Sequence, residues 1–264
     1  MQRLAGKIAV ITGGGGDIGA ESAKLFAKEG ATVLLVDIKE EACQKVIKEI
    51  GSDAVSYYVA DVTKADQVQA YVQTAVDRHG GIDIFLGNAG IDGAVSPIHE
   101  YPVDVFQKVI DLNIVGVFLG LKYVIPAMIA RGGGSCILTS SMAGLKGSPA
   151  MCAYVTSKHA LIGLMRTAAV EYGAYNIRVN CINPGCVESQ MMRSVEEGYV
   201  PLSLALAGTQ LDRQGVHDDI ASKIPMKRYA TTEDVAKLML FLASDESSFC
   251  SGAFYMVDGG TTAV

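Results

Sequence analysis

The sequence has few of the features that mark nucleic-acid-binding, metal-binding or disulfide-stabilised proteins. Its 264 residues include 22 Lys and Arg against 28 Asp and Glu, which gives a formal net charge of −6. This net negative charge gives no indication of a basic nucleic-acid-binding surface, so we expect no nucleic-acid partner. The six cysteines form no Cys-x-x-Cys pair and have no histidines at zinc-binding spacing, so we expect no metal site. Free thiols are typical of a reducing compartment, and we predict a cytoplasmic protein.

No secretory or membrane-spanning segment is predicted either. The chain begins with polar residues that are followed at once by a strand-like run, which is not the pattern of a signal peptide. The most apolar stretch, 109–130, contains Asp111, Asn113, Lys122 and Pro126. Polar and charged residues inside such a stretch favour a buried helix over a membrane span, so we expect no membrane partner.

Length and composition favour a single globular domain over residues 1–264. Half of the residues are apolar and 19% are charged, which is typical of a chain that folds around a core. A chain of this length can bury one sizeable core, and we find no linker or low-complexity segment that would divide it.

Short apolar runs rich in β-branched residues alternate with longer segments of helix-forming composition. Strands are predicted at 7–12, 31–36, 54–59, 82–86, 135–140, 177–182 and 253–257, and helices at 20–29, 39–50, 64–79, 103–130, 152–173 and 232–243. This alternation predicts an α/β fold, a Rossmann-type doubly wound parallel sheet of about seven strands with helices on both faces. The exception is 186–226, an irregular Met-, Leu- and Gly-rich region too long for an ordinary connection, which we interpret as a substrate lid.

A glycine-rich turn connects the first predicted strand to the first predicted helix. Gly14, Gly16 and Gly19 satisfy the pattern Gly-x-Gly-x-x-Gly. A strand, a glycine turn and a helix together present free backbone N–H groups and a helix N-terminus to a phosphate. The turn therefore predicts a dinucleotide site, although a glycine-rich turn without a ligand has the same sequence pattern.

An acidic residue, Asp37, ends the second predicted strand about 20 residues after the glycines. A carboxylate there accepts hydrogen bonds from the adenosine ribose and repels a 2′-phosphate. The glycine turn has no Lys or Arg to compensate, and the next residue is Ile38, so the sequence favours NAD over NADP. Asp37 could also cap the helix that follows it.

Tyr154 and Lys158 are four residues apart and share one face of a predicted helix. A nearby ammonium group favours the phenolate, so we expect Lys158 to lower the pKa of Tyr154. Such a tyrosine can move a proton to or from an alcohol or carbonyl oxygen. The hydroxyl of Ser141 could hold the same oxygen in place.

Taken together, these motifs resemble those of the short-chain dehydrogenase/reductase family over nearly the whole chain. Thr12 to Gly19 resembles the family's Thr-Gly-x-x-x-Gly-x-Gly motif, and Asn113 lies where the family has the fourth member of its catalytic tetrad. The resemblance implies catalytic roles for Asn113, Ser141, Tyr154 and Lys158. The residues it implies for cofactor binding are Gly13, Gly16, Asp17, Ile18, Gly19, Asp37, Ile38, Asp61, Val62, Asn88, Ala89, Gly90, Tyr154, Lys158, Pro184, Gly185, Val187 and Ser189.

Two residues depart from the family pattern. Asp17 stands where the motif usually has its second glycine, and Gly87 replaces the first Asn of Asn-Asn-Ala-Gly. We expect the Asp17 side chain to lie near the cofactor pyrophosphate, where it would oppose binding, or to cap the following helix.

The resemblance implies hydride transfer between NAD and a secondary alcohol or ketone. The residues expected to contact the substrate are Ser141, Met142, Met151, Tyr154, Met191 and Met192. Their mostly apolar character favours an uncharged, hydrophobic small molecule, such as a cyclic one, although Met and Leu also serve ordinary core packing.

Other activities of the same family remain open at this stage. A 3-oxoacyl-carrier-protein reductase is one alternative, opposed by Asp37 and by the acidic net charge, and a sugar or polyol dehydrogenase is another. From a different class, the chain could be a dinucleotide-sensing scaffold without turnover. The resemblance also implies a homotetramer.

Overall fold

The computed structural model describes residues 2–263, which are built on one seven-stranded sheet in the order β3-β2-β1-β4-β5-β6-β7. Every neighbouring pair of strands is parallel. The strands are β1 (Ile8–Thr12), β2 (Thr32–Asp37), β3 (Val55–Val59), β4 (Ile84–Gly87), β5 (Gly134–Thr139), β6 (Ile177–Pro184) and β7 (Phe254–Val257). The predicted α/β fold class is confirmed.

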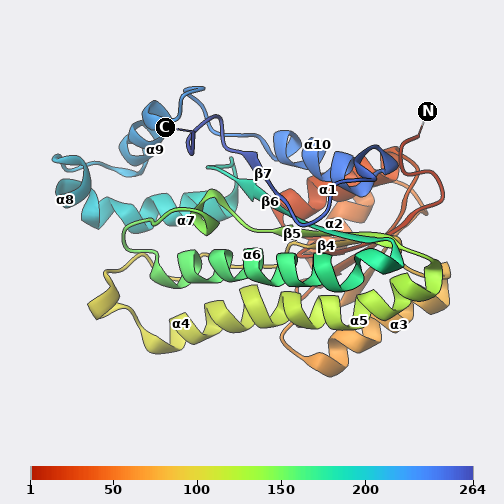
Figure 1. Cartoon of the computed structure of the whole chain (residues 1–264). Coiled ribbons are helices and arrows are strands. Elements are labelled where there is room, and N and C mark those ends of the chain that lie inside the picture. The colour runs from red at the N-terminus through yellow and green to blue at the C-terminus, as the bar shows by residue number, and fades with distance from the viewer. Residues whose placement is uncertain (1, 264) are drawn as a thin grey trace.

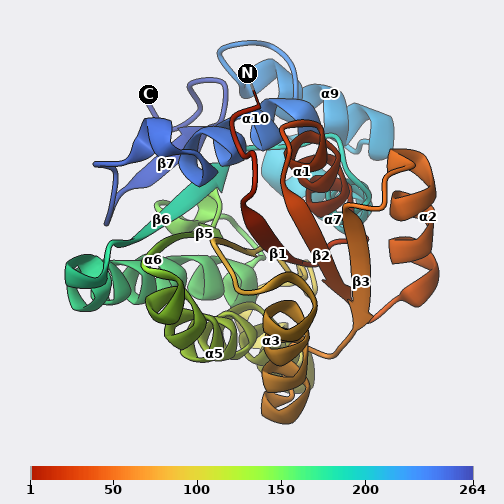
Figure 2. The same ribbon diagram turned by 90° about the vertical axis from the view of Figure 1, so that its right-hand side faces the viewer.

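Helices cover both faces of the sheet (Figures 1 and 2). One face carries α1 (Asp17–Lys28), α2 (Glu40–Ile50) and α10 (Thr232–Ala243), and the other carries α3 (Ala65–His79), α4 (Val103–Ile110), α5 (Gly116–Arg131) and α6 (Cys152–Tyr172). Three further helices, α7 (Gln190–Tyr199), α8 (Ser203–Ala207) and α9 (Arg213–Lys223), lie together beyond the carboxyl ends of the strands (Figure 1).

The strands are buried on both faces, which explains why they read as continuous apolar runs in the sequence. In β2, Val33 and Leu35 join the core under α1 and α10, whereas Leu34 and Val36 join the core under α3, α5 and α6. All four side chains are fully buried. Alternate residues of each strand therefore stabilise opposite layers.

The strand order reverses between β1 and β4. From β1 the chain moves outward through β2 and β3, and it then returns to place β4 on the other side of β1. The connections that leave the carboxyl ends of β1 and β4 consequently diverge, and a crevice opens between them. This crevice is where the functional residues gather.

Several details differ from the sequence-based expectations. The first helix begins at Asp17 rather than at residue 20, and Gly16, whose backbone is extended, is its N-cap. The helix expected over 103–130 is interrupted by a π-helical segment, Asp111–Val115. The region 186–226, expected to be irregular, is largely helical, with α7, α8 and α9 joined by short connections.

The helical stretch Val103–Arg131 is long and apolar enough to cross a membrane by length and composition alone, with a mean hydropathy of 1.8 over its most apolar window. Half of that window is buried against the rest of the protein, as in the core helix of a globular fold. Its sheet-facing side chains, including Val117, Leu121 and Val124, belong to the core that also contains Phe85.

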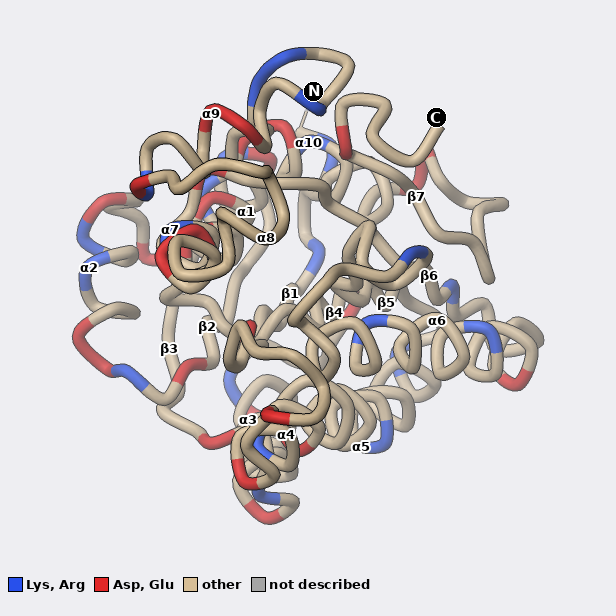
Figure 3. Tube along the Cα trace, turned by 90° about the vertical axis from the view of Figure 1, so that its left-hand side faces the viewer, with Lys and Arg blue, Asp and Glu red and all other residues tan. Residues whose placement is uncertain are grey.

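Charged residues of both signs are interspersed along the chain trace (Figure 3). Lysine and arginine segments lie beside aspartate and glutamate segments on the outer helices, in keeping with the net charge of −6. Several of these are i,i+4 pairs on helix surfaces, such as Lys223 with Asp219 at 2.6 Å and Lys237 with Glu233 at 2.9 Å.

Candidate active site

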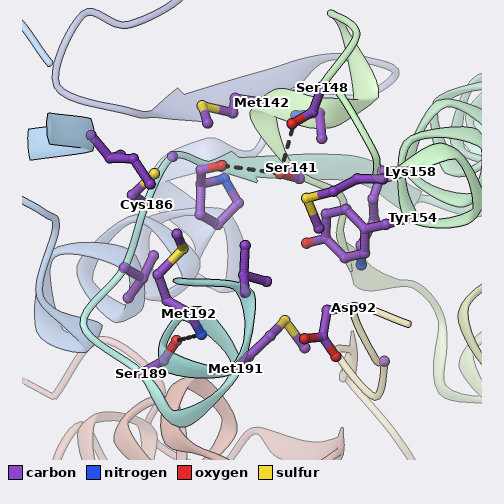
Figure 4. A pocket seen from close by; sticks show the side chains of 18 of the residues that line it. Asp92, Ser141, Met142, Ser148, Tyr154, Lys158, Cys186, Ser189, Met191 and Met192 are labelled. Atoms are coloured by element: carbon purple, nitrogen blue, oxygen red, sulfur yellow. Dashed lines mark hydrogen bonds between the residues drawn. The ribbon is translucent and has the colours of Figure 1, made fainter. Parts of the chain in front are cut away.

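A cavity of about 770 Å³ opens at the carboxyl ends of the strands and extends from the glycine loop, Gly13–Gly16, to the three helices of the lid. Its size suits a small ligand together with part of a cofactor. Figure 4 shows the end of the cavity where Tyr154 and Lys158 face Met191 and Met192 of α7. The lid is defined here as residues 186–226.

Close packing fixes the glycine loop and the helix that follows it. Gly13 has a φ of +64°, and a Cβ there would lie 3.0 Å from the Cα of Ala89. A Cβ on Gly19, in the first turn of α1, would collide with the carbonyl oxygen of Gly13. Gly16 lines the cavity, and a Cβ there would only touch the carbonyl oxygen of Gly13 at 3.4 Å. The bare backbone at Gly16 is the kind of cradle that holds an anionic group.

The N-terminus of α1 points at the same cradle. Its N-cap is Gly16, and no side chain caps the helix. The free N–H groups of the first turn and the helix dipole therefore favour a bound anion at this place. The prediction that Asp17 caps this helix is wrong, since Asp17 is the first helical residue.

The Asp17 carboxylate instead contacts the lid. Its Oδ2 accepts a hydrogen bond of 2.7 Å from the backbone N–H of Gln190, the first residue of α7. Asp17 thus lines the cavity, as expected for a residue near the cofactor, and it also joins the glycine loop to a helix 173 positions later in the chain.

Asp37 closes the other end of the glycine loop. Its Oδ2 accepts a hydrogen bond of 3.0 Å from the N–H of Gly15, and its Oδ1 accepts one of 3.0 Å from the N–H of Lys39. The N-cap of α2 is Lys39, so Asp37 is not the cap that the sequence offered as an alternative. Both Asp37 and Lys39 line the cavity, whereas the side chain of Ile38 is 64% exposed and lies outside it.

The structure brings Ser141, Tyr154 and Lys158 together, although Ser141 and Tyr154 come from different elements. Ser141 follows β5, while α6 presents Tyr154 and Lys158 one turn apart. Lys158 Nζ lies 5.3 Å from the centroid of the Tyr154 ring and donates a hydrogen bond of 2.7 Å to the carbonyl oxygen of Thr139. Ser141 Oγ accepts a hydrogen bond of 3.1 Å from the N–H of Ala143.

Burial dominates the electrostatics of this cluster. Burial raises the pKa of Tyr154 to about 12, and interaction with the Ser141 hydroxyl lowers it only in part. The same desolvation lowers the pKa of Lys158 to about 8. The expected lowering of the Tyr154 pKa by Lys158 is therefore not found with these protein groups alone, because the phenolate would be desolvated and the ammonium group is turned to a backbone carbonyl. The phenol is protonated at neutral pH.

Asn113 lies at the centre of the π-helical segment and lines the cluster from behind. Its side chain accepts a hydrogen bond of 2.9 Å from the N–H of Ile91 and donates to Ile91 O at 2.9 Å and to Ser157 Oγ at 3.0 Å. A π-turn is frequent at functional sites because it displaces one residue from the helical register. Here the displaced residue connects α6 to the loop after β4.

Most of the predicted cofactor and substrate residues line the cavity. Those that do are Gly13, Gly16, Asp17, Ile18, Asp37, Asn88, Ala89, Gly90, Ser141, Met142, Met151, Tyr154, Lys158, Pro184, Gly185, Val187, Ser189, Met191 and Met192. Four predicted cofactor residues lie outside its lining: Gly19, Ile38, Asp61 and Val62. Of these, Val62 is buried against Gly116, and Asp61 accepts hydrogen bonds from Thr63.

A buried polar network that the sequence did not reveal supports the cluster. Asn183 Nδ2 donates a hydrogen bond of 2.7 Å to Ser141 O, and Ser140 Oγ donates one of 2.9 Å to Lys158 O. Asn183 Oδ1 is buried without a hydrogen-bond partner among residues 2–263. The signal was present in Asn183-Pro184-Gly185, but the partner residues could be identified only once β5, β6 and α6 were placed side by side.

The cysteines near the cavity do not form a second reactive centre. All six cysteines of the chain are free, and burial raises the pKa of Cys186 to about 11. Such a thiol is protonated and weakly nucleophilic at neutral pH. Among residues 2–263, no group of three or more potential metal ligands is brought together.

Comparison with known proteins gives consistent matches along the whole chain. Residues 15–262 match a family profile described as enoyl-(acyl carrier protein) reductase. The mitochondrial borneol dehydrogenase of Lavandula x intermedia is 39% identical over 263 residues, which cover 99% of this chain and 93% of that protein. Levodione reductase of Leifsonia aquatica is 36% identical over 265 residues, which cover 99% of this chain and 96% of that protein.

Two crystal structures match the fold as closely. A structure of levodione reductase superposes with a TM-score of 0.93 at 34% identity, covering 99% of this chain and all of that chain. A structure of NAD⁺-bound xylitol dehydrogenase superposes with a TM-score of 0.92 at 37% identity, covering 98% of this chain and all of that chain. These matches show that the chain belongs to the short-chain dehydrogenase/reductase family, as an oxidoreductase of CH–OH and C=O groups that uses a nicotinamide dinucleotide.

Proposed function

We propose that the protein is an NAD-dependent dehydrogenase of mostly apolar, cyclic secondary alcohols and the corresponding ketones. The observation that carries this proposal is the placement of Tyr154, beside Ser141 and Lys158, at the base of a cavity whose lid side is built from Met and Leu side chains. The nicotinamide supplies or receives the hydride, and the protein supplies position and proton transfer.

In this proposal Tyr154 exchanges a proton with the substrate oxygen. A phenol with a pKa of about 12 is in the acid form that ketone reduction requires at neutral pH. Ser141 donates a hydrogen bond to the same oxygen and so holds it against Tyr154. Lys158, whose Nζ lies 5.3 Å from the centroid of the Tyr154 ring, would hold the nicotinamide ribose. Asn113, whose side chain is fixed by Ile91 and Ser157, holds α6 in register, and its backbone together with a water would link Lys158 to solvent for proton relay.

The preference for NAD is assigned to Asp37. Its carboxylate lines the cavity and is fixed by the N–H groups of Gly15 and Lys39, so it can accept hydrogen bonds from ribose hydroxyls but would repel a 2′-phosphate. The xylitol dehydrogenase structure, 37% identical, was obtained with NAD⁺ bound. Lys39, the N-cap of α2, also lines the cavity beside this carboxylate. Its positive charge would reduce the preference for NAD over NADP.

The proposed substrate class follows from the lining. The apolar side chains at the lid end are Met142, Met151, Met191, Met192, Val195, Leu206, Leu211, Val216, Ile220 and Ile224. Met side chains adapt to irregular ring systems. The names of the relatives, borneol dehydrogenase and levodione reductase, also refer to cyclic alcohols and ketones.

Initial rates at 340 nm test the proposal directly. We expect NADH formation from cyclohexanol and borneol with NAD⁺, and at least tenfold lower kcat/KM with NADP⁺. A protein that binds NAD⁺ in calorimetry but oxidises no secondary alcohol and reduces no ketone would be a dinucleotide-sensing scaffold instead.

A polyol dehydrogenase is the second candidate. It is supported by the similarity to xylitol dehydrogenase and by the polar side chains of Asp92 and Ser148 in the cavity wall. Greater kcat/KM for xylitol than for cyclohexanol would favour it. The description of the family profile refers to an acyl-carrier-protein reductase, but the acidic net charge of −6 opposes docking of an acidic carrier, and Asp37 opposes NADPH.

We further propose a homotetramer located in the cytoplasm. Large apolar side chains are exposed on the outer faces of α5 and α6, with Phe118 46% exposed and Val170 86% exposed, and Phe249 is fully exposed near the C-terminal strand. Association would bury these side chains. Light scattering at micromolar concentration should give four times the mass of 27.8 kDa, and a monomer would contradict the proposal.

A further inference from the structure

Four carboxylates line the cavity, and three of them already have partners. Asp17 accepts the N–H of Gln190, and Asp37 accepts the N–H groups of Gly15 and Lys39. Asp219 forms an ion pair of 2.6 Å with Lys223. The fourth, Asp92, interacts with the Ser194 side chain and the neighbouring backbone but forms no ion pair among residues 2–263, and no role has been assigned to it.

Asp92 is placed at the substrate end of the cavity rather than at the cofactor end. It follows β4 by five residues, beyond Asn88–Gly90, and Figure 4 shows it beside Met191, below the Tyr154 ring in this view. Burial is the main cause of the raised pKa of Tyr154, and the charge of Asp92 is a smaller contribution in the same direction. Asp92 and Tyr154 line the same cavity.

No cation neutralises Asp92. None of the ion pairs among residues 2–263 includes it. Burial raises its pKa, and interaction with Ser194 and with its neighbouring backbone lowers it only in part. A half-buried carboxylate without a counter-ion has a high demand for hydrogen-bond donors. A substrate that fills this end of the cavity displaces water from the carboxylate and must replace the lost hydrogen bonds.

We propose that Asp92 accepts a hydrogen bond from a second hydroxyl group of the substrate, so that the preferred substrates are cyclic diols and hydroxyketones rather than simple cyclic alcohols. The inference rests on the proposed function, since it places the reacting oxygen at Tyr154 and Ser141. The inference makes the proposed function more specific: the apolar wall contacts the ring of the substrate, and Asp92 accepts a hydrogen bond from its polar substituent. The same charge repels carboxylate-bearing substrates at this end of the cavity, so oxo acids should be poorer substrates than uncharged ketones.

The test compares cyclohexanol with the 1,2-, 1,3- and 1,4-cyclohexanediols, using NAD⁺ and initial rates at 340 nm. The variants are Asp92→Leu, which removes the acceptor, and Asp92→Asn, which keeps an acceptor oxygen without the charge. We expect wild-type protein to prefer at least one diol over cyclohexanol. Asp92→Leu should lower kcat/KM for that diol by about 10- to 100-fold, the range for a lost hydrogen bond to a charged group. It should change kcat/KM for cyclohexanol by less than about threefold. For the diol, kcat/KM of Asp92→Asn should lie between the values of wild type and Asp92→Leu.

Glu100→Gln provides the charge-matched control. Glu100 is exposed on the same connection between β4 and α4 and does not line the cavity, so its loss removes a negative charge without touching the substrate. It should leave all four rates unchanged. Thermal unfolding and NAD⁺ binding of each Asp92 variant show whether the fold is retained.

Each outcome separates the two proposals. If Asp92→Leu lowers the rates with cyclohexanol and with the diols equally, Asp92 acts on the protonation of Tyr154 or on the fold. The inference is then overturned while the proposed function stands. The inference is also overturned if wild-type protein oxidises cyclohexanol but Asp92→Leu leaves the rate with every diol unchanged. If wild-type protein oxidises none of these alcohols, the proposed function fails, and the inference fails with it.

Discussion

The wall of the cavity formed by the strand ends and the wall formed by the lid are held in place by different kinds of contact. At the strand ends, positions are set by backbone: Gly13 packs on Ala89, and Gly19 packs on Gly13 so closely that neither tolerates a Cβ. In the lid, positions are set by side chains on short helices, and Leu204 and Leu206 of α8 remain 60% and 48% exposed. The cofactor side is therefore specified by a short local motif, and the lid by contacts spread over about forty residues.

The main side-chain contact of the lid is buried. Glu196 of α7 is 1% exposed, receives a hydrogen bond of 2.9 Å from Arg213 of α9, and lies 2.9 Å from Nδ1 of His217. The ring of His217 packs 4.2 Å from the ring of Tyr229. A buried carboxylate with two basic partners fixes α7 against α9, and so fixes the Met side chains that α7 presents to the cavity.

Several hydrogen bonds join the two walls: Tyr199 of α7 contacts Ser148 and the carbonyl oxygen of Pro149 after β5, and one bond comes from the glycine loop's side. The Asp17 carboxylate, which belongs to the glycine loop's helix, accepts the first N–H of α7. Asp17, which departs from the family's glycine pattern, is thus the residue that bonds the glycine-loop side of the cavity to the lid. Substitutions in the two walls, and at this hydrogen bond, separate their contributions.

The largest effect is expected where both walls converge, at Tyr154. Tyr154→Phe removes the proton donor but keeps the ring that packs over Lys158, so kcat should fall by about 100- to 10,000-fold while NAD⁺ affinity changes by less than about threefold. Steady-state rates and calorimetry measure the two constants. Tyr175→Phe, on a ring that is 51% exposed outside the cavity, is the control. A Tyr154→Phe protein that keeps a tenth of its rate would contradict the acid–base role.

The next largest effect is expected in the strand-end wall. Gly19→Ala places a methyl group against the carbonyl oxygen of Gly13, which displaces the glycine loop from the N-terminus of α1. NAD⁺ affinity should fall by about 100-fold, and the melting temperature should fall as well. Gly163→Ala on α6 is the matched control, because nothing lies within 4 Å of its Cβ position. That control should be neutral or stabilising, since Ala is the better helix former. Unchanged NAD⁺ affinity in Gly19→Ala would show that the loop is less constrained than its packing indicates.

The same contrast explains what the sequence could predict. The glycine loop, Asp37 and the Tyr154–Lys158 pair are local patterns on elements of clear periodicity, so their placement at the strand ends was predictable. The π-turn at Asn113 was not, because DLNIV has ordinary helical composition and the displacement depends on Ile91 and Ser157 from other elements. The helices of the lid were not predicted because each is short, and their apolar residues face the cavity or one another. The sequence therefore shows no sustained helical repeat of apolar residues in this region. His217 is half-buried against Glu196, a contact that could not be predicted because it depends on two helices meeting.

In the lid, Glu196→Gln should separate substrate binding from cofactor binding. The change leaves the positive charge of Arg213 without its buried partner and loosens α7 against α9. We expect KM for the alcohol to rise by about tenfold, with NAD⁺ affinity unchanged, and hydrogen exchange to increase across 190–223. Glu197→Gln, on the neighbouring residue that is exposed, is the control. An equal loss of NAD⁺ affinity would show that the lid and the cofactor wall form one unit.

Within the strand-end wall, Asp37→Ala should change cofactor choice without affecting the lid. Removing the carboxylate takes away the acceptor for ribose hydroxyls and the repulsion of a 2′-phosphate, while Lys39 remains in the cavity lining. The ratio of kcat/KM for NAD⁺ to that for NADP⁺ should fall by about tenfold. Exposed Asp53, which does not line the cavity, offers Asp53→Ala as a control. An unchanged ratio would mean that ribose recognition lies elsewhere.

The smallest effect, and the most direct test of how the walls communicate, is expected at Asp17. Asp17→Asn keeps an oxygen that can accept the Gln190 N–H but removes the charge next to the anionic cofactor, so NAD⁺ affinity should rise a few-fold and KM for the alcohol should stay constant. Asp17→Gly removes the acceptor as well. It should show the same gain in NAD⁺ affinity together with a few-fold higher KM and faster hydrogen exchange at the Gln190 amide. If Asp17→Gly changes NAD⁺ affinity alone, the hydrogen bond does not hold the lid. If it changes KM alone, the Asp17 charge does not oppose the cofactor, and the departure from glycine at this position serves the lid only.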